Sequence, residues 1–224
     1  MIKNISKYLV VIIIILVLFF WLSSGFYTIK SGEEAVILRL GKYKTTVSTA
    51  GLNWHMPSPI ETANKVNVLE VKRLEFGYRT LEEGSHKQVA IYGDVPASES
   101  LMLTGDENMV NVETAIQYKI TNAVDYFFNV KEPEQTLRIA AESAIRRVIA
   151  NNILDEVLTE NKFEIQQEIM NDLQKICDDY RLGVTILAVQ LQDVYPPDEV
   201  DAAFKDVANA REDRNSYVNE AESY

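Results

Sequence analysis

Few side chains in this sequence are of the types that carry out chemistry, and their spacing does not bring them together. The chain of 224 residues has two histidines, His55 and His86, and one cysteine, Cys177. A lone cysteine cannot form an internal disulfide, and with two distant histidines it cannot build an ordinary structural zinc site. The sequence has no HExxH or GxSxG motif and no glycine-rich phosphate loop, so the usual metalloprotease, hydrolase and nucleotidase mechanisms lack their parts. We therefore predict no catalytic, cofactor-binding or metal-ligating residue, and a protein that is not an enzyme.

The individual candidates have simpler interpretations. His55 follows Trp54 in a proline-rich segment and His86 lies in a polar stretch, so an exposed or packing role is expected for both. Cys177 falls on the apolar side of a predicted helix, where a small buried residue is expected. Asp106 and Glu107 suggest a cation site at first sight, but the spacing of a calcium loop is missing. A tight turn requires polar residues at such positions, and we interpret the pair in that way.

Composition argues against two further classes of protein, those that bind nucleic acid and those that are disordered. The chain carries 22 basic and 33 acidic residues, a formal net charge of −11, which argues against nucleic acid as a partner because such binding needs clustered Lys and Arg. With 47% apolar residues the chain is too hydrophobic to be disordered. Its length allows one or two domains with a sizeable core.

Much of the apolar content lies in one segment near the N-terminus. Leu9–Leu22 is an unbroken apolar run, and Tyr8–Ile29 contains no charge. At about 1.5 Å per residue, a helix of this length spans the roughly 30 Å hydrocarbon core of a bilayer. We predict an uncleaved transmembrane anchor over residues 8–29. A cleaved signal peptide and a buried core helix are the alternatives. The residues expected to face lipid are Leu9, Ile12, Ile15, Leu18 and Trp21.

Flanking charge predicts the orientation of this anchor. Lys3 and Lys7 precede it with no acidic residue nearby, so the positive-inside rule puts residues 1–7 in the cytoplasm. The chain is then a single-pass protein of the plasma (inner) membrane, with its bulk on the extracytoplasmic or periplasmic side.

The remaining elements alternate between strand and helix and indicate an α+β fold. Strands are expected at residues 33–40, 65–76 and 184–194, with loop-like stretches at 45–60 and 80–100, the latter a long polar loop or a small hairpin. Leu101–Thr104, the turn Gly105–Asn108 and the strongly alternating Met109–Ile120 predict a hairpin. Helices are expected after Pro133 and from Asn161 to a terminating Gly183.

Two segments suggest contacts with partners. Leu52, Trp54, Met56 and Ile60 are apolar residues in a segment too rich in proline for an ordinary strand. They either enter the outer face of the same bilayer or pack on the sheet. Residues 198–224 have apolar positions spaced alternately by three and four, which is typical of a coiled coil. Lateral packing against identical or sister helices competes with a solvated single helix, and the interface candidates are Val200, Val207, Arg211, Arg214 and Tyr217. No stop signal precedes Tyr224, so the natural protein is expected to continue.

Several motifs together resemble a known family. They are Gly51–Pro57 (GLNWHMP) with Pro59–Glu61, Leu101–Met109 (LMLTGDENM), Phe128–Val130, Ala140–Ala144, Leu154–Thr159, Leu191–Val194 with Pro196–Pro197, Arg211–Arg214 and Asn219–Ala221. In this register the sequence resembles the HflK proteins of the stomatin/prohibitin/flotillin/HflK (SPFH, or band 7) superfamily over Phe26–Tyr224. The family's coiled coil continues beyond this chain, and residues 80–100 match the family poorly.

The resemblance implies an architecture and a function. Residues 30–100 would form a membrane-proximal SPFH α/β domain, residues 101–197 a second one, and residues 198–224 the beginning of a long coiled coil. The protein would be a non-enzymatic scaffold that forms a ring or cage of many subunits with an HflC-like sister protein. It would modulate the membrane AAA protease FtsH by restricting substrate access. The alternative is a general stomatin- or prohibitin-like membrane-microdomain scaffold without a tie to FtsH.

Overall fold

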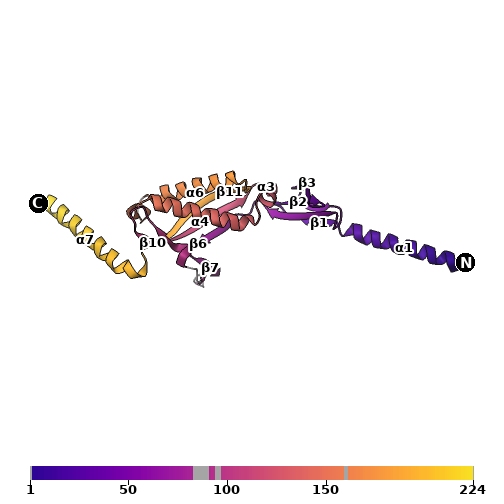
Figure 1. The fold of residues 1–224 in the computed structure, drawn as a ribbon, viewed down its shortest axis with the longest axis horizontal. Coiled ribbons are helices and arrows are strands. Elements are labelled where there is room, and N and C mark those ends of the chain that lie inside the picture. The colour runs from indigo at the N-terminus through magenta and orange to yellow at the C-terminus, as the bar shows by residue number, and fades with distance from the viewer. Residues whose placement is uncertain (1, 83–90, 94–96, 159–160, 224) are drawn as a thin grey trace. The chain divides into compact units, whose positions relative to one another are not determined.

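The chain folds into two compact units of mixed α and β structure (Figure 1). The computed structural model describes residues 2–82, 91–93, 97–158 and 161–223. Unit 1 comprises Met1–Val71, Lys119–Pro133 and Tyr180–Thr185, and unit 2 comprises Lys72–Tyr118, Glu134–Asp179 and Ile186–Tyr224. Successive segments of the chain therefore alternate between the units. The α+β class expected from the sequence is confirmed.

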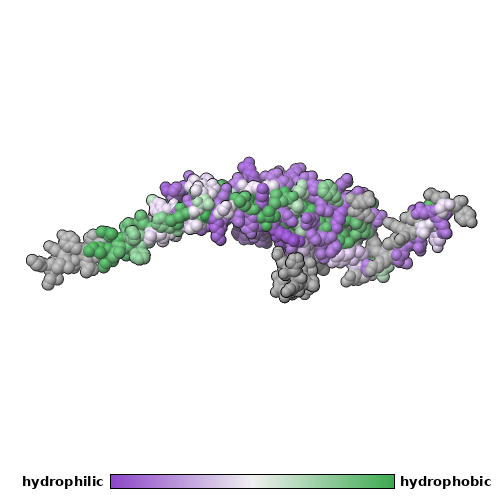
Figure 2. Space-filling model, turned by 180° about the vertical axis from the view of Figure 1, so that it is seen from behind, coloured by the Kyte–Doolittle hydropathy of each residue, from purple (hydrophilic) through white to green (hydrophobic). Residues whose placement is uncertain are grey.

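The first element of unit 1 is the helix α1, Ile2–Ser23. Its described surface is almost entirely apolar, as the green stretch of Figure 2 shows. The helix ends at Ser23 and the strand β1 begins at Phe26, so the last residues of the uncharged stretch are not helical. Among the helices in the described part of the chain, none combines the length and the apolar composition that crossing a bilayer requires.

The centre of unit 1 is an antiparallel sheet in the order β3-β2-β5, made of Lys42–Val47, Glu33–Arg39 and Glu61–Asn67. Buried Ile29, Ala35 and Ile37 form its core, with Tyr27, Val47 and Ala63 packed against them. A separate two-stranded ribbon pairs β1, Phe26–Ile29, with β4, Gly51–Trp54.

Two expectations for this region are wrong. The loop-like stretch 45–60 contains the end of β3 and all of β4, because backbone pairing with β2 and β1 overrides its turn-forming composition. The single strand expected at 65–76 is two strands, β5 and β6. Between them the Asn67 side-chain oxygen accepts hydrogen bonds from the backbone N–H groups of Leu69 and Glu70. This turn lies where the apolar alternation of the sequence changes parity.

A short helix completes unit 1. In α3, Ala123–Phe128, the Asn122 side chain caps the N-terminus by accepting from the backbone N–H groups of Val124 and Asp125. The carbonyl of Gly183 accepts from the backbone N–H groups of Thr121 and Asn122. Gly183 has a φ of +69°, and a Cβ there would lie 2.4 Å from the Asn122 carbonyl oxygen. Only glycine fits this approach.

Unit 2 is built on a sheet in the order β11-β10-β6, with β9 also paired to β10. These strands are Val184–Tyr195, Met109–Ile120, Lys72–Phe76 and Leu101–Leu103. The predicted hairpin is confirmed, since Met109 pairs with Leu103 and Asn111 with Leu101 in antiparallel register. The strand β10 buries the face that the sequence pattern marks as apolar, including Val110, Val112 and Ile116.

Two long helices, α4 (Pro133–Asn151) and α6 (Lys162–Asp179), run along this sheet (Figure 1). Both were expected, and both bury an apolar stripe. The buried residues are Leu137, Ala140, Ala141, Ala144, Ile145, Val148 and Ile149 of α4, and Ile165, Ile169, Leu173 and Cys177 of α6. An ion pair between Arg147 and Asp172 joins the two helices. The short helix α5, Leu154–Leu158, lies between them in the sequence, and α7, Asp198–Glu222, follows β11.

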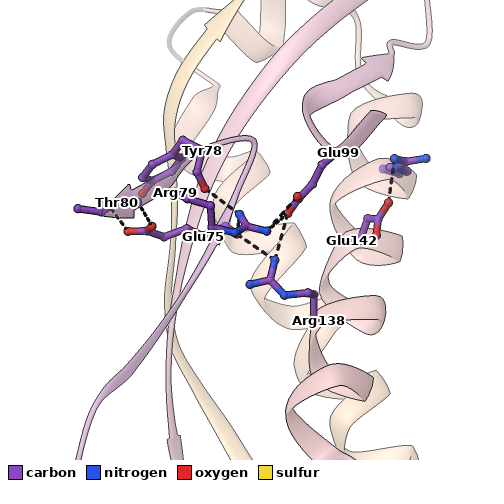
Figure 3. A network of polar contacts seen from close by, with 8 residues as sticks. Glu75, Tyr78, Arg79, Thr80, Glu99, Arg138 and Glu142 are labelled. Carbon is purple, nitrogen blue, oxygen red and sulfur yellow. Dashed lines mark hydrogen bonds and ion pairs between the residues drawn. The ribbon is translucent and has the colours of Figure 1, made fainter. Parts of the chain in front are cut away.

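The stretch 80–100 is a small hairpin in its described part, which was one of the two alternatives. Strands β7, Arg79–Glu82, and β8, Ile91–Gly93, pair antiparallel, and the short helix α2, Ala97–Ser100, follows. Glu99 joins this segment to the rest of unit 2 (Figure 3). Its carboxylate accepts hydrogen bonds from Arg79 at 2.7 and 2.9 Å and from Arg138 of α4 at 3.1 Å. The Arg138 guanidinium also lies 5.1 Å from the centre of the Phe76 ring.

Replacing Glu99 therefore tests how this segment is held. Glu99→Gln is expected to lower the free energy of unfolding by about 1.5–3 kcal/mol, because two guanidinium groups lose a charged acceptor. Chemical denaturation of the full chain in detergent measures this loss. The matched control is Glu142→Gln, which removes an exposed pair with Arg146 within α4 and is expected to cost about 0.3–0.5 kcal/mol. Equal losses of unfolding free energy in the two variants would contradict the role of Glu99 in holding this segment.

Candidate membrane-facing surface

The C-terminal end of α1 is fixed to the β structure of unit 1 by three hydrogen bonds. The indole N–H of Trp21 donates to the Ser58 carbonyl at 3.0 Å, and that of Trp54 donates to the Leu22 carbonyl at 3.1 Å. The backbone N–H of His55 donates to the Gly25 carbonyl at 3.0 Å. A Cβ on Gly25 would lie 2.1 Å from the His55 carbonyl oxygen, so this close approach requires glycine.

An exposed apolar surface follows directly after α1. The ribbon register pairs Phe26 with Trp54 and Thr28 with Leu52, and directly opposed residues share one face of a ribbon. The side chains of Phe26, Leu52 and Trp54 are 56%, 71% and 48% exposed, and that of Met56, just beyond β4, is 40% exposed. We call Phe26, Leu52, Trp54 and Met56 the apolar ribbon face. Apolar side chains gathered in this way are typical of a surface that has a partner.

The structure places the predicted loop residues unequally. Leu52, Trp54 and Met56 are exposed, whereas Ile60 is partly buried and its carbonyl accepts from the Leu40 backbone N–H. Trp54 is held through its indole N–H, which donates to the Leu22 carbonyl, while the residue stays 48% exposed. Contact of these residues with lipid stays a prediction.

A buried carboxylate, that of Glu61, forms hydrogen bonds with the segment that carries Met56 and with β2 and β3. Glu61 is 1% exposed, and its oxygens accept from Arg39 Nε at 2.8 Å, Lys44 Nζ at 2.8 Å and the backbone N–H of Met56 at 3.0 Å. The hydrogen bond from Lys44, with those from Met56 and Arg39, outweighs burial and lowers the pKa of Glu61 to about 2. From the sequence, Glu61 stands out only as the end of a family motif, and its buried ion pairs were missed, because Arg39 and Lys44 are distant from it in the chain.

The other predicted contact residues can be placed in part. In α1 the side chains of Ile12, Ile15 and Leu18 are 57%, 61% and 55% exposed and that of Trp21 38%, while that of Leu9 lies outside the described residues. The segment predicted to begin a coiled coil after Pro197 is helical, as α7, and its packing against other helices stays a prediction. Val200, Arg214 and Tyr217 are exposed on it. The side chains of Val207 and Arg211 lie outside the described residues.

The described residues that were considered as candidates for chemistry, His55 and Cys177, pack against other parts of the chain. The His55 ring lies 5.1 Å from the Tyr27 ring, with its Nδ1 2.6 Å from the Met56 carbonyl. Cys177 is buried, which raises its pKa to about 12 and confirms the expected core position. His86 lies outside the described residues. Within the described ranges, no group of three His, Cys, Asp or Glu side chains is arranged to hold a metal ion.

The turn interpretation of Asp106 is confirmed. Its carboxylate accepts from the Thr104 hydroxyl at 2.6 Å, from the Asn108 side-chain amide at 2.8 Å and from the Leu154 backbone N–H at 3.1 Å. These bonds, that of Thr104 first, lower the pKa of Asp106. The carboxylate therefore organises the hairpin turn and joins it to the start of α5.

Comparison with known proteins shows to which family this chain belongs. A model of the SPFH domain / Band 7 family matches residues 27–224. The chain belongs to this family. Within the SPFH family it is similar to HflK proteins, as the sequence motifs indicated. Protein HflK of Borreliella burgdorferi is 32% identical over 215 residues, which cover 96% of this chain and 67% of that protein.

Two further SPFH relatives are similar over nearly the whole chain. Protein HflK of Buchnera aphidicola subsp. Schizaphis graminum is 39% identical, with 99% of this chain and 49% of that protein covered. The protein named modulator of FtsH protease HflK in Escherichia coli K12 is 38% identical, with 91% and 43% covered. The chain thus spans about half the length of these two SPFH relatives.

Glu61 gives a stability prediction with a defined pH dependence. A carboxylate whose folded pKa is about 2, against about 4.3 in the unfolded chain, contributes stability above the unfolded value and loses it as pH falls through the folded value. Glu61→Gln is expected to destabilise unit 1 at pH 7 by about 1–3 kcal/mol. The difference from the unmodified chain should shrink between pH 5 and about pH 2. Thermal unfolding at several pH values measures it.

The control for this prediction is Glu70→Gln, which changes an exposed carboxylate of the same unit. This substitution is expected to have little effect on thermal unfolding at any pH of the series. A Glu61→Gln deficit that stays constant down to pH 2 would show that the carboxylate charge is not what stabilises the site.

Proposed function

We propose that this chain is part of a membrane-anchored, non-enzymatic scaffold that modulates an FtsH-like membrane AAA protease. The observation that carries the proposal is the 38% identity, over 91% of this chain, to the Escherichia coli protein whose name is modulator of FtsH protease. The surroundings of His55 and Cys177 support a non-catalytic role, since one packs against a tyrosine and the other is buried with a raised pKa.

The membrane part of the proposal rests on the N-terminal sequence and on unit 1. The uncharged residues 8–29 are proposed to anchor the chain in the plasma (inner) membrane, with residues 1–7 in the cytoplasm and the rest on the extracytoplasmic side. The apolar ribbon face follows this segment directly and exposes three large side chains and a methionine. We propose that it enters the outer interface of the same bilayer, where tryptophan and other amphipathic rings are favoured.

Assembly is the second part of the proposal. Helix α7 is 25 residues long, exposes Tyr217 and Val200, and continues the three–four spacing of apolar positions. We propose that it packs laterally against α7 of other copies and against an HflC-like sister protein. Contacts of this kind are individually weak, but many subunits confined to one membrane plane multiply them. A ring or cage formed in this way would limit which substrates reach the protease.

A second function is favoured by the breadth of the family. The family that matches residues 27–224 is described by its SPFH domain alone, and a domain fold does not fix one function. A general stomatin- or prohibitin-like membrane-microdomain scaffold would need the same anchor and the same lateral contacts. The two functions differ only in whether an FtsH-like protease is bound.

Purification of the crosslinked complex distinguishes these functions. The tagged chain, expressed in its own host and solubilised in mild detergent, is expected to carry an FtsH-like protease and an HflC-like protein into a large assembly. Mass spectrometry identifies both and imaging shows the assembly. A large assembly without the protease would favour the general scaffold, and the chain recovered alone would contradict the proposal.

Charge reversal on α7 tests the lateral contact. Replacing Arg211 and Arg214 together by Glu is expected to shift the assembly to smaller species on native gels. Each new like-charge contact costs about 0.5 kcal/mol and recurs at every interface of the assembly. The control, Lys131→Glu with Lys175→Glu, changes the net charge equally at exposed positions outside α7. Unchanged assembly in the first variant, or equal loss in both, would count against a role of these arginines.

A further inference from the structure

The turn between β2 and β3 carries a residue that folding does not explain. Leu40 and Gly41 form a two-residue turn with φ values of +50° and +82°. Such turns favour Asn-Gly or Gly-Gly, because a side chain with a Cβ is strained at positive φ. Leu40 is also 78% exposed, more than any other large apolar side chain that the structure describes. A residue that is both strained and exposed does not stabilise the folded chain, so its presence indicates a role in binding something else.

Basic side chains surround this leucine. Arg39 and Lys42 are directly paired in the register of β2 and β3, so their side chains share one face. Lys44 reaches the same place, since both it and Arg39 bind Glu61. The side chains of Arg39 and Lys44 remain 50% and 42% exposed despite these bonds, and Lys42 is exposed. We call Arg39, Leu40, Lys42 and Lys44 the basic tip.

The basic tip differs in charge from most of the chain. Residues 26–67 hold five basic and three acidic side chains, whereas residues 68–224 hold 15 basic and 30 acidic ones. Glu61 pairs with two of the three cations at the tip, Arg39 and Lys44, and Lys42 adds a third positive charge, so a net positive charge remains there. The natural complement of such a surface is an anionic one.

The basic tip is also continuous with the apolar ribbon face. The backbone N–H of Leu40 donates to the Ile60 carbonyl at 2.9 Å, and the Trp21 indole of α1 binds the carbonyl of Ser58, two residues earlier. Glu61 binds the backbone N–H of Met56 together with Arg39 and Lys44. The exposed leucine and its cations are therefore held to the segment that joins α1.

We propose that the basic tip docks on the anionic phospholipid headgroups of the bilayer that α1 enters, with Leu40 inserted below the level of the phosphates. Lys and Arg side chains bind headgroup phosphates while an adjacent apolar side chain reaches the acyl boundary. This explains why a leucine stands at a strained and exposed turn position. The inference rests on the proposed membrane anchor and adds a preference for anionic lipid.

Site-directed spin labelling of the full chain tests the proposal. A nitroxide is attached to Leu40→Cys, and buried Cys177 stays unlabelled. The chain is reconstituted into vesicles of phosphatidylcholine alone or with phosphatidylglycerol, and depth is measured from accessibility to oxygen and to a water-soluble nickel chelate. The label is expected to be lipid-accessible in anionic vesicles and mainly water-accessible in neutral ones. In a Lys42→Gln background the ratio of lipid-exposed to water-exposed label should fall about fivefold.

Two further label sites make each outcome decisive. Leu69→Cys, 71% exposed and just beyond the other end of β5, is the matched control and should stay water-accessible. Leu52→Cys reports on the apolar ribbon face.

Lipid contact at position 52 with water contact at position 40 overturns the docking of the basic tip and leaves the proposed membrane contact of the apolar ribbon face intact. Water contact at both positions overturns both proposals. Equal depth at 40 in neutral and anionic vesicles overturns the role of charge. Shielding at 40 from both probes, with label–label broadening, assigns the tip to protein contact and also overturns the proposal.

Discussion

A buried carboxylate must be matched by cations and hydrogen-bond donors, and in unit 1 this requirement falls on Glu61. Its partners come from β2, from β3 and from the segment that follows β4. Because one acceptor binds all three, the turn that carries Leu40 and the segment that carries Met56 cannot be positioned independently. The segments that carry the exposed apolar side chains Leu40 and Met56 are therefore tied together through Glu61, although these side chains lie outside the core.

This kind of constraint separates what the sequence predicts from what it does not. The strand β10, the helices α4 and α6 and the hairpin turn at Asp106 follow from patterns that are complete within one element. Val110–Ile120 alternate along one strand, and Asp106 has polar neighbours within two residues. Glu61 has no such signature, since Arg39 and Lys44 meet it only after β2, β3 and β5 have paired. The strand β4 was missed for the same reason, as its pairing with β1 is long-range. The split between β5 and β6 had a local signal, the change of parity at the Asn67 turn, which the prediction of a single strand passed over.

The distribution of charge has a physical meaning that the total of −11 conceals. Lys3 and Lys7 precede the proposed anchor segment, residues 26–67 are slightly basic, and the rest of the chain is strongly acidic. An acidic body keeps its distance from an anionic bilayer, and repulsion falls off within about 8–10 Å at physiological salt. A basic stretch next to the proposed anchor would offset that repulsion locally. If residues 8–29 anchor the chain as proposed, this charge distribution favours the basic end of unit 1 at the lipid surface.

A scaffold built from weak lateral contacts depends on restricted orientation as much as on affinity. A chain held by a single helix can rotate about it and tilt, so a helix such as α7 would meet its neighbours in many geometries. Each proposed contact between unit 1 and lipid would remove part of this freedom before assembly begins. The entropy lost at each lateral contact is then smaller, and the effective concentration of correctly oriented partners is higher. The Trp21 and Trp54 hydrogen bonds serve the same end, because they fix the end of α1 to the β structure of unit 1 instead of leaving a flexible linker.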